Sequence, residues 1–111
     1  MDTPYESREP PRGEVDLWPG AVLLEFGTAW CGHCRAAKPH VEAALREHPG
    51  VRHVRIADGS GRPLGRSFRV KLWPTLVFLH DGAEVERLVR PGDAQAIRAA
   101  LARIDPPGGP R

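Results

Sequence analysis

Four short segments of the chain have the pattern of β-strands, and turn residues separate them. They cover residues 21–26, 51–57, 75–79 and 84–89, with the length and the apolar or alternating composition that are typical of strands. The segments 21–26 and 75–79 are almost continuously apolar, which is the pattern of strands buried on both faces. Asp81-Gly82 separates the last two segments, and this dipeptide favours a tight hairpin.

Three other segments carry apolar residues at helical spacing. The first covers residues 32–47 and is stopped by Pro49-Gly50. A short helix is expected over 63–69, because a proline at its start suits the first helical turn. The last helix follows Asp93, a suitable N-cap residue. Its apolar stripe recurs every three or four residues up to Ile104.

The order of these elements predicts an α/β fold with one mixed sheet. The chain alternates strand, helix, strand, helix and strand before the hairpin and the last helix. We therefore expect the first three strands to be parallel, with right-handed crossovers, and the hairpin to add an antiparallel strand. In such sheets, functional sites lie beyond the carboxyl ends of the parallel strands.

Length and composition indicate one globular domain with irregular ends. The chain has 111 residues, enough for one hydrophobic core. Seven of its 12 prolines lie in residues 1–20 and 105–111. We therefore expect an irregular N-terminal arm over 1–20, a folded domain over 21–104 and a flexible tail over 105–111.

Charge and hydropathy argue against nucleic-acid and membrane partners. The formal net charge is +2, and 14 of the 16 basic residues are Arg, which we interpret as a solvated surface. The longest apolar run near the N-terminus covers only residues 21–24. An export signal needs about 7–15 apolar residues and a membrane-spanning helix about 20. We therefore expect a cytoplasmic protein, in which two Cys suggest catalysis or metal binding before a structural disulfide.

Cys31 and Cys34 have the spacing of a redox-active pair. They lie at the start of the first predicted helix, and side chains three residues apart on a helix have Cβ atoms about 5–6 Å apart. A disulfide needs about 3.5–4.5 Å, so a small adjustment would close the bond. The helix N-terminus should lower the pKa of Cys31, whereas Cys34 should be more buried. We expect Cys31 to attack a substrate disulfide and Cys34 to resolve the mixed disulfide; the alternative is an inert structural pair.

The motif Trp-Cys-Gly-His-Cys at 30–34, with Trp-Pro-Thr at 73–75, resembles the thioredoxin superfamily over residues 20–104. Further agreement comes from Glu25, Pro39, Arg55 and Gly82. The resemblance implies a thioredoxin-like fold, with a central mixed sheet of four, possibly five, strands and about three helices. The lower number of strands follows because residues 1–20 look too short and too rich in proline for the first strand and helix of a full thioredoxin.

The resemblance also implies roles for residues around the dithiol. Cys31 matches the family's nucleophile and Cys34 its resolving cysteine. Pro74 matches a cis proline that faces the dithiol, and the backbone beside it pairs with the substrate chain. We expect the substrate groove to be formed by Trp30, Gly32, Trp73 and Pro74, with Arg90 on its border.

Glu25 and Arg55 match a buried acid and a nearby basic residue in the family. The acid lies under the dithiol and handles the proton of the resolving cysteine. A carboxylate among apolar neighbours is costly unless it is paired or protonated, so we expect burial to favour its protonated form and Arg55 to oppose this. The alternative is a solvated Glu25 at a sheet edge.

His33 distinguishes this motif from that of most thioredoxins. Protein disulfide isomerases have His at this position, where thioredoxins usually have Pro. An imidazole beside the nucleophile would stabilise the thiolate and make the disulfide more oxidising.

These residues predict a protein-disulfide reductase that needs only its own Cys31–Cys34 disulfide, without metal, nucleotide or flavin. Expected partners are disulfide-containing proteins and a recycling disulfide reductase, and we expect a monomer. The alternatives are a disulfide oxidase or isomerase, favoured by His33, and a non-enzymatic interaction module. A zinc site is a remote alternative, because Cys31, Cys34, His48 and His53 match a loose two-Cys, two-His spacing.

Overall fold

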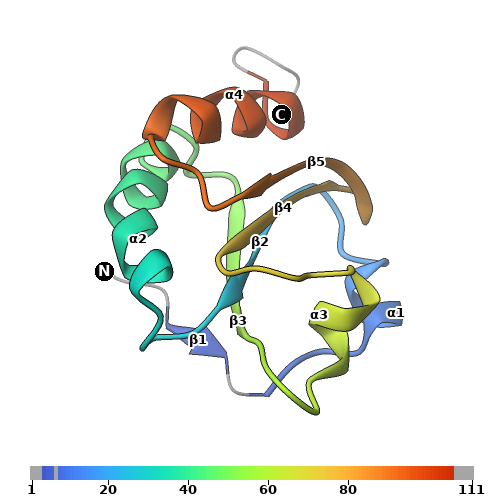
Figure 1. Cartoon of the computed structure of the whole chain (residues 1–111). Helices are drawn as coiled ribbons and strands as arrows, with labels where there is room; N and C mark the ends of the chain where they lie inside the picture. The colour runs from blue at the N-terminus through green and yellow to red at the C-terminus, as the bar shows by residue number, and fades with distance from the viewer. Residues whose placement is uncertain (1–3, 7, 107–111) are drawn as a thin grey trace.

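The computed structural model describes residues 4–6 and 8–106, and it confirms an α/β fold around one mixed sheet (Figure 1). The strands are β1 (Tyr5–Glu6), β2 (Ala21–Gly27), β3 (Arg52–Ala57), β4 (Thr75–His80) and β5 (Ala83–Val89). The helices are α1 (Arg12–Val15), α2 (Gly32–Leu45), α3 (Pro63–Ser67) and α4 (Ala94–Ile104). Within the described residues, no helix combines the length and apolar character needed to cross a membrane.

The strands lie side by side in the order β1-β3-β2-β4-β5. β1 and β2 are both parallel to β3, whereas β4 is antiparallel to β2 and β5 to β4. The carboxyl ends of β2 and β3 meet at one edge of the sheet, where Gly27 is opposite Ala57. The chain leaves this edge to enter α2, so the two Cys lie beyond the carboxyl end of a central parallel strand, as predicted.

Helices cover both faces of the sheet, with α2 and α4 on one face and α1 and α3 on the other (Figure 1). Side chains alternate across the sheet along a strand. Thus Val22, Leu24 and Phe26 of β2 belong to the core under α1 and α3, whereas Leu23 belongs to the core under α2 and α4. This double burial explains why β2 reads as a continuous apolar run. Alternation places Glu25 on the same face as Leu23.

The third predicted strand runs in the opposite direction from the one expected. β4 is antiparallel to β2, with Phe26 opposite Thr75 and Ala21 opposite His80. The start of β4 at Thr75 lies beside the carboxyl end of β2, the edge at which β3 also ends. The segment 58–74, which contains α3, therefore returns to that edge instead of crossing the sheet.

The N-terminal arm differs from the irregular segment that its composition predicts. Tyr5 and Glu6 form a fifth strand on the free edge of β3, and α1 adds a fourth helix. Val15 is fully buried, and Trp18 is 9% exposed. The sequence did not predict these elements, because a strand of two residues and a helix of four are too short to show a periodicity. The four prolines and the few apolar residues also favoured an irregular segment. From residue 107 on, the predicted tail lies outside the described residues.

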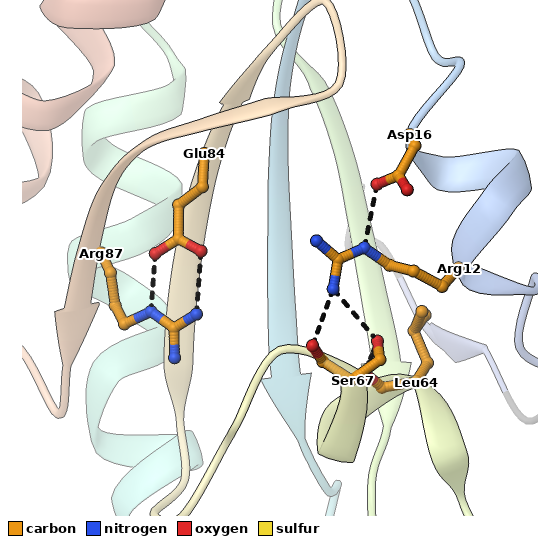
Figure 2. A network of polar contacts seen from close by, with 6 residues as sticks. All are labelled: Arg12, Asp16, Leu64, Ser67, Glu84 and Arg87. Carbon is orange, nitrogen blue, oxygen red and sulfur yellow. Dashed lines mark hydrogen bonds and ion pairs between the residues drawn. The ribbon is translucent and has the colours of Figure 1, made fainter.

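Arg12 ties α1 to α3 (Figure 2). Its Nε donates a hydrogen bond to Asp16 Oδ1 at 2.9 Å, and its Nη1 donates to the carbonyl oxygen of Ser67 at 2.7 Å. The same guanidinium lies 3.7 Å from the centre of the Phe68 ring, within the range of a cation–π contact. Long-range contacts of this kind hold the arm against the domain, and they have no local signature in the sequence.

Candidate active site

Cys31 and Cys34 lie at the junction between β2 and α2. Cys31 is the N-cap residue of α2, with extended φ and ψ angles of −77° and 124°, and the helix begins at Gly32. Cys34, one turn further, is 1% exposed, whereas Cys31 is partly exposed. Both thiols are free. The expectation of an accessible first thiol and a buried second thiol is confirmed.

The surroundings of the two thiols move their pKa values apart. Burial tends to raise the pKa of Cys31, but the backbone N–H and the thiol of Cys34 outweigh burial and lower this pKa. The backbone N–H of His33 and the charge of Arg90 act in the same direction. Burial raises the pKa of Cys34. Cys31 therefore ionises more readily than Cys34; the role expected for the His33 imidazole stays a prediction.

A connected set of residues forms a rim beside Cys31. The peptide bond between Trp73 and Pro74 is cis, as the family resemblance implies. The rings of Trp30 and Trp73 meet edge to face, with 5.8 Å between centroids, and Trp30 is 73% exposed. Arg90 donates from Nε to the carbonyl oxygen of Trp73 at 2.8 Å and from its backbone N–H to that of Pro74 at 3.0 Å.

Gly32 leaves the surface next to Cys31 open. It is exposed, and a Cβ added there would meet no atom within 4 Å. Of the other predicted groove residues, Trp30 and Arg90 are exposed, Trp73 is half-buried and Pro74 is buried. The predicted residues therefore gather beside Cys31, but Pro74 does not itself reach the surface.

Asp58 supports this rim and was missed as a site residue, since its segment reads only as a turn. Trp73 Nε1 donates to Asp58 Oδ2 at 2.9 Å, and the backbone N–H of Asp58 donates to the carbonyl oxygen of Gly27 at 3.0 Å. The aspartate thus links the rim indole to the end of β2. Only the folded chain brings positions 58 and 73 together.

Glu25 is buried and paired. Its residue is 1% exposed, so the alternative of a solvated edge position is wrong. Oε1 lies 2.8 Å from His53 Nε2 and 3.4 Å from Arg55 Nε. Oε2 is buried and has no hydrogen-bond partner among the described residues. The expected pairing of Glu25 with Arg55 is confirmed, and His53 adds a second basic partner.

Glu25 lies on the face of β2 that also faces Cys34. Residues two apart on a strand point to the same face, so Glu25 shares its face with Gly27. A Cβ built on Gly27 would lie 2.5 Å from Cys34 Sγ. Glu25 and the Cys34 thiol therefore occupy the same side of the sheet, under the start of α2.

A polar cavity of about 440 Å³ reaches this acid. Glu25, Lys38, His53 and Arg55 are among its lining residues. The side chain of His53 is 14% exposed, so its ring bridges the buried carboxylate and the cavity. This arrangement can pass a proton between Glu25 and solvent.

His53 was considered from the sequence only as a zinc ligand, and the structure gives it a different setting. His48 Nδ1 lies 2.8 Å from Asp105 Oδ2, so the two His contact different carboxylates rather than the cysteines. Among the described residues, no group of three or more His, Cys, Asp or Glu side chains is gathered as metal ligands. The sequence could have indicated this role. Positions 53 and 55 share one face of β3, so a residue at 53 lies on the same side as Arg55, which was expected beside Glu25.

Tyr5 also reaches the site and was missed. Its ring lies under the guanidinium of Arg55, 3.8 Å from centroid to Cζ. Its hydroxyl lies 2.8 Å from the point that a Cβ on Gly27 would occupy. The arm therefore contributes a residue to the surroundings of Cys34.

Comparison with known proteins gives consistent relatives. Residues 14–103 match the Thioredoxin family. A thioredoxin from Chlamydia trachomatis is 41% identical over 71 residues, which are 63% of this chain and 69% of the relative. Protein disulfide-isomerase A2 from Pongo abelii is 36% identical over 89 residues, 75% of this chain and 17% of that relative. The structure of reduced thioredoxin 2 from Pseudomonas aeruginosa PAO1 superposes with a TM-score of 0.87 and 50% identity, covering 97% of this chain and 100% of that one.

Proposed function

Because the chain belongs to the thioredoxin family, we propose that Cys31 and Cys34 are the dithiol with which it reduces disulfide bonds in other proteins. The family relationship establishes the chain as a thiol–disulfide oxidoreductase with disulfide-reductase activity. The observation that carries the residue assignment is the contrast at the start of α2. An accessible thiol with a lowered pKa stands one turn from a buried thiol with a raised pKa.

The reaction begins with attack by the Cys31 thiolate on one sulfur of the substrate disulfide. The substrate S–S bond breaks, a Cys31–substrate disulfide forms, and the other substrate sulfur leaves as a thiolate. Cys34 then gives up its proton and attacks Cys31 Sγ. The Cys31–Cys34 bond forms as the second substrate sulfur leaves, and the substrate has gained two electrons and, after protonation, two protons.

Glu25 is the proposed acceptor of the Cys34 proton. It is a buried carboxylate on the same face of β2 as the resolving thiol, and Oε2 accepts no hydrogen bond from the described residues. His53 donates to Oε1 and also lines the polar cavity. We assign His53 the transfer of this proton to solvent, and we assign Arg55 the stabilisation of the charged carboxylate at 3.4 Å.

The rim is the proposed binding surface for the substrate chain. Trp30 and Trp73 offer apolar ring surface, and the backbone beside Pro74 matches the segment that pairs with the substrate chain in the family. Arg90 positions the Trp73–Pro74 segment through both of its hydrogen bonds. Gly32 leaves room for the peptide beside Cys31.

A disulfide oxidase or isomerase is the second candidate, favoured by His33 and by the similarity to a protein disulfide-isomerase. Groups that stabilise the Cys31 thiolate stabilise the reduced dithiol, and this makes the disulfide a stronger oxidant. The reduction potential of the Cys31–Cys34 pair separates the two. Values of about −270 mV and −180 mV describe thioredoxin and protein disulfide isomerase; we expect an intermediate value.

We further propose a monomeric cytoplasmic protein that acts on disulfide-containing proteins and is returned to the dithiol by a disulfide reductase, with no metal, nucleotide or flavin of its own. The direct test is reduction of insulin disulfides with dithiothreitol as electron donor, followed by turbidity. A rate well above that of dithiothreitol alone supports the reductase. No acceleration would refute it.

A further inference from the structure

Cys34 and the N-terminal arm meet at the space above Gly27, where the glycine has no side chain. A Cβ at Gly27 would lie 2.5 Å from Cys34 Sγ and 2.8 Å from Tyr5 Oη. These two atoms therefore flank the same small space, on the face of β2 under α2. The absence of a side chain at position 27 lets a hydroxyl from the arm reach the sulfur region.

The fold holds Tyr5 in this place from two directions. β1 pairs with β3, with Tyr5 opposite Arg55. The Arg55 guanidinium lies 3.8 Å from the centre of the Tyr5 ring, so the ring is clamped by a cation–π contact. The hydroxyl is buried, and no described residue meets the geometry of a hydrogen bond with it. A buried hydroxyl without a hydrogen-bond partner is unfavourable. Another protonation state of the site can supply that partner.

We propose that Tyr5 donates a hydrogen bond from its hydroxyl to the Cys34 thiolate, and so stabilises it during the resolving step. The inference rests on the proposed role of Cys34. The Cys34 proton passes to Glu25, while Tyr5 keeps its own proton and forms an O–H···S⁻ contact. The thiolate then attacks Cys31 Sγ, the substrate thiolate leaves, and the contact weakens because Cys34 sulfur is neutral again.

The electrostatics of the site favour a Tyr5 hydroxyl that keeps its proton and acts only as a hydrogen-bond donor. Burial raises the pKa of Tyr5, and the charge of Glu25 and the contact with Cys34 raise it further. The phenol therefore stays protonated across the working pH range. Burial raises the pKa of Cys34, and the Tyr5 hydroxyl acts in the opposite direction.

The test compares two variants that contain only the resolving thiol, Cys31→Ser and Cys31→Ser/Tyr5→Phe. Phenylalanine keeps the ring on Arg55 and removes only the hydroxyl. The rate of Cys34 alkylation by iodoacetamide is measured from pH 6 to 11. Because a hydrogen bond to a charged group is stronger than one between neutral groups, we expect the apparent pKa of Cys34 to rise by about one unit in the double variant. Equal pKa values would overturn the proposal, whatever happens to stability.

A second measurement keeps the proposal testable in the complete dithiol. With a disulfide peptide under single-turnover conditions, Tyr5→Phe should leave release of the first substrate thiol unchanged and slow release of the second about tenfold. If both steps slow equally, the hydroxyl serves the structure of the site and the proposal fails. Neither measurement depends on turnover of insulin. A failure of the proposed reductase activity would instead appear in the insulin assay of the unmodified protein.

Discussion

His53 and Glu25 form a partly buried hydrogen bond between neighbouring strands, with 2.8 Å between Nε2 and Oε1. The carboxylate side chain is 1% exposed and the imidazole 14%. Arg55, two residues further along the same face of β3, approaches the same oxygen from 3.4 Å. The acid behind the dithiol is therefore held by a titratable partner and a permanently charged one, and only the titratable partner can carry a proton.

Replacing His53 by Gln tests the proton route. Glutamine can still donate a hydrogen bond to Glu25, but it cannot accept and release a proton. We expect release of the second substrate thiol to slow by about tenfold, less than the factor of roughly 100 to 10,000 that a direct acid or base supplies. Stopped-flow measurement of the two thiol-release steps checks this, and the first step is the internal control. Unchanged kinetics of the second step would remove His53 from the route.

Replacing Glu25 by Gln removes the proposed proton acceptor itself. The side chain keeps its size, so packing under the dithiol is preserved. We expect the resolving step to slow by about 100-fold near neutral pH and to recover partly at high pH, where hydroxide can remove the Cys34 proton. The same single-turnover assay measures it. A rate equal to that of the unmodified protein at pH 7 would mean that water alone accepts the proton.

The cysteine variants should divide the two halves of the reaction. Cys31→Ser should abolish insulin reduction, because a hydroxyl is a far weaker nucleophile than a thiolate. Cys34→Ser should leave the first attack intact and trap Cys31–substrate disulfides, visible by non-reducing gel electrophoresis and mass spectrometry. Trapping by Cys31→Ser instead would reverse the assigned order.

The pKa values of the two thiols should depart from that of an ordinary cysteine in opposite directions. Burial acts against ionisation of Cys31, but the N–H and thiol of Cys34 outweigh it and lower the pKa; burial raises that of Cys34. Alkylation needs the thiolate, so labelling of Cys31 should reach half its maximal rate at a lower pH than labelling of an ordinary cysteine, and labelling of Cys34 at a higher pH. Site-resolved mass spectrometry of pulse-alkylated protein measures both. If both thiols showed the alkylation midpoint of an ordinary cysteine, the proposed difference between their pKa values would be wrong.

Gly27→Ala should be destabilising, because the added methyl group would overlap Cys34 Sγ and Tyr5 Oη. Overpacking of this kind costs about 1–3 kcal/mol, measured as the change in the free energy of unfolding in urea. Gly13→Ala in α1 is the matched control, since a Cβ there meets no atom within 4 Å. Its stability should stay the same or rise slightly. Equal effects of the two substitutions would show that the space above Gly27 adapts freely.

Much of this molecule follows from short-range patterns. The apolar runs of β2 and β4, the Asp-Gly turn before β5 and the Asp93 cap of α4 all appear where they were predicted. These features depend on neighbours within a few residues, through alternation, periodicity and capping. The position of Cys31 at the start of α2 is of the same kind, because a strand that ends at a glycine and a helix that follows it are both local features.

What only the tertiary structure decided depends on residues far apart along the chain. The sequence by itself determined the order of the central elements, the dithiol and the acid in β2. It did not determine that β4 runs antiparallel, since that depends on the edge of the sheet to which the segment 58–74 returns. Nor did it bring Tyr5 to Gly27 or His53 to Glu25, because these contacts arise from strand pairing and register, which join residues 22 and 28 positions apart.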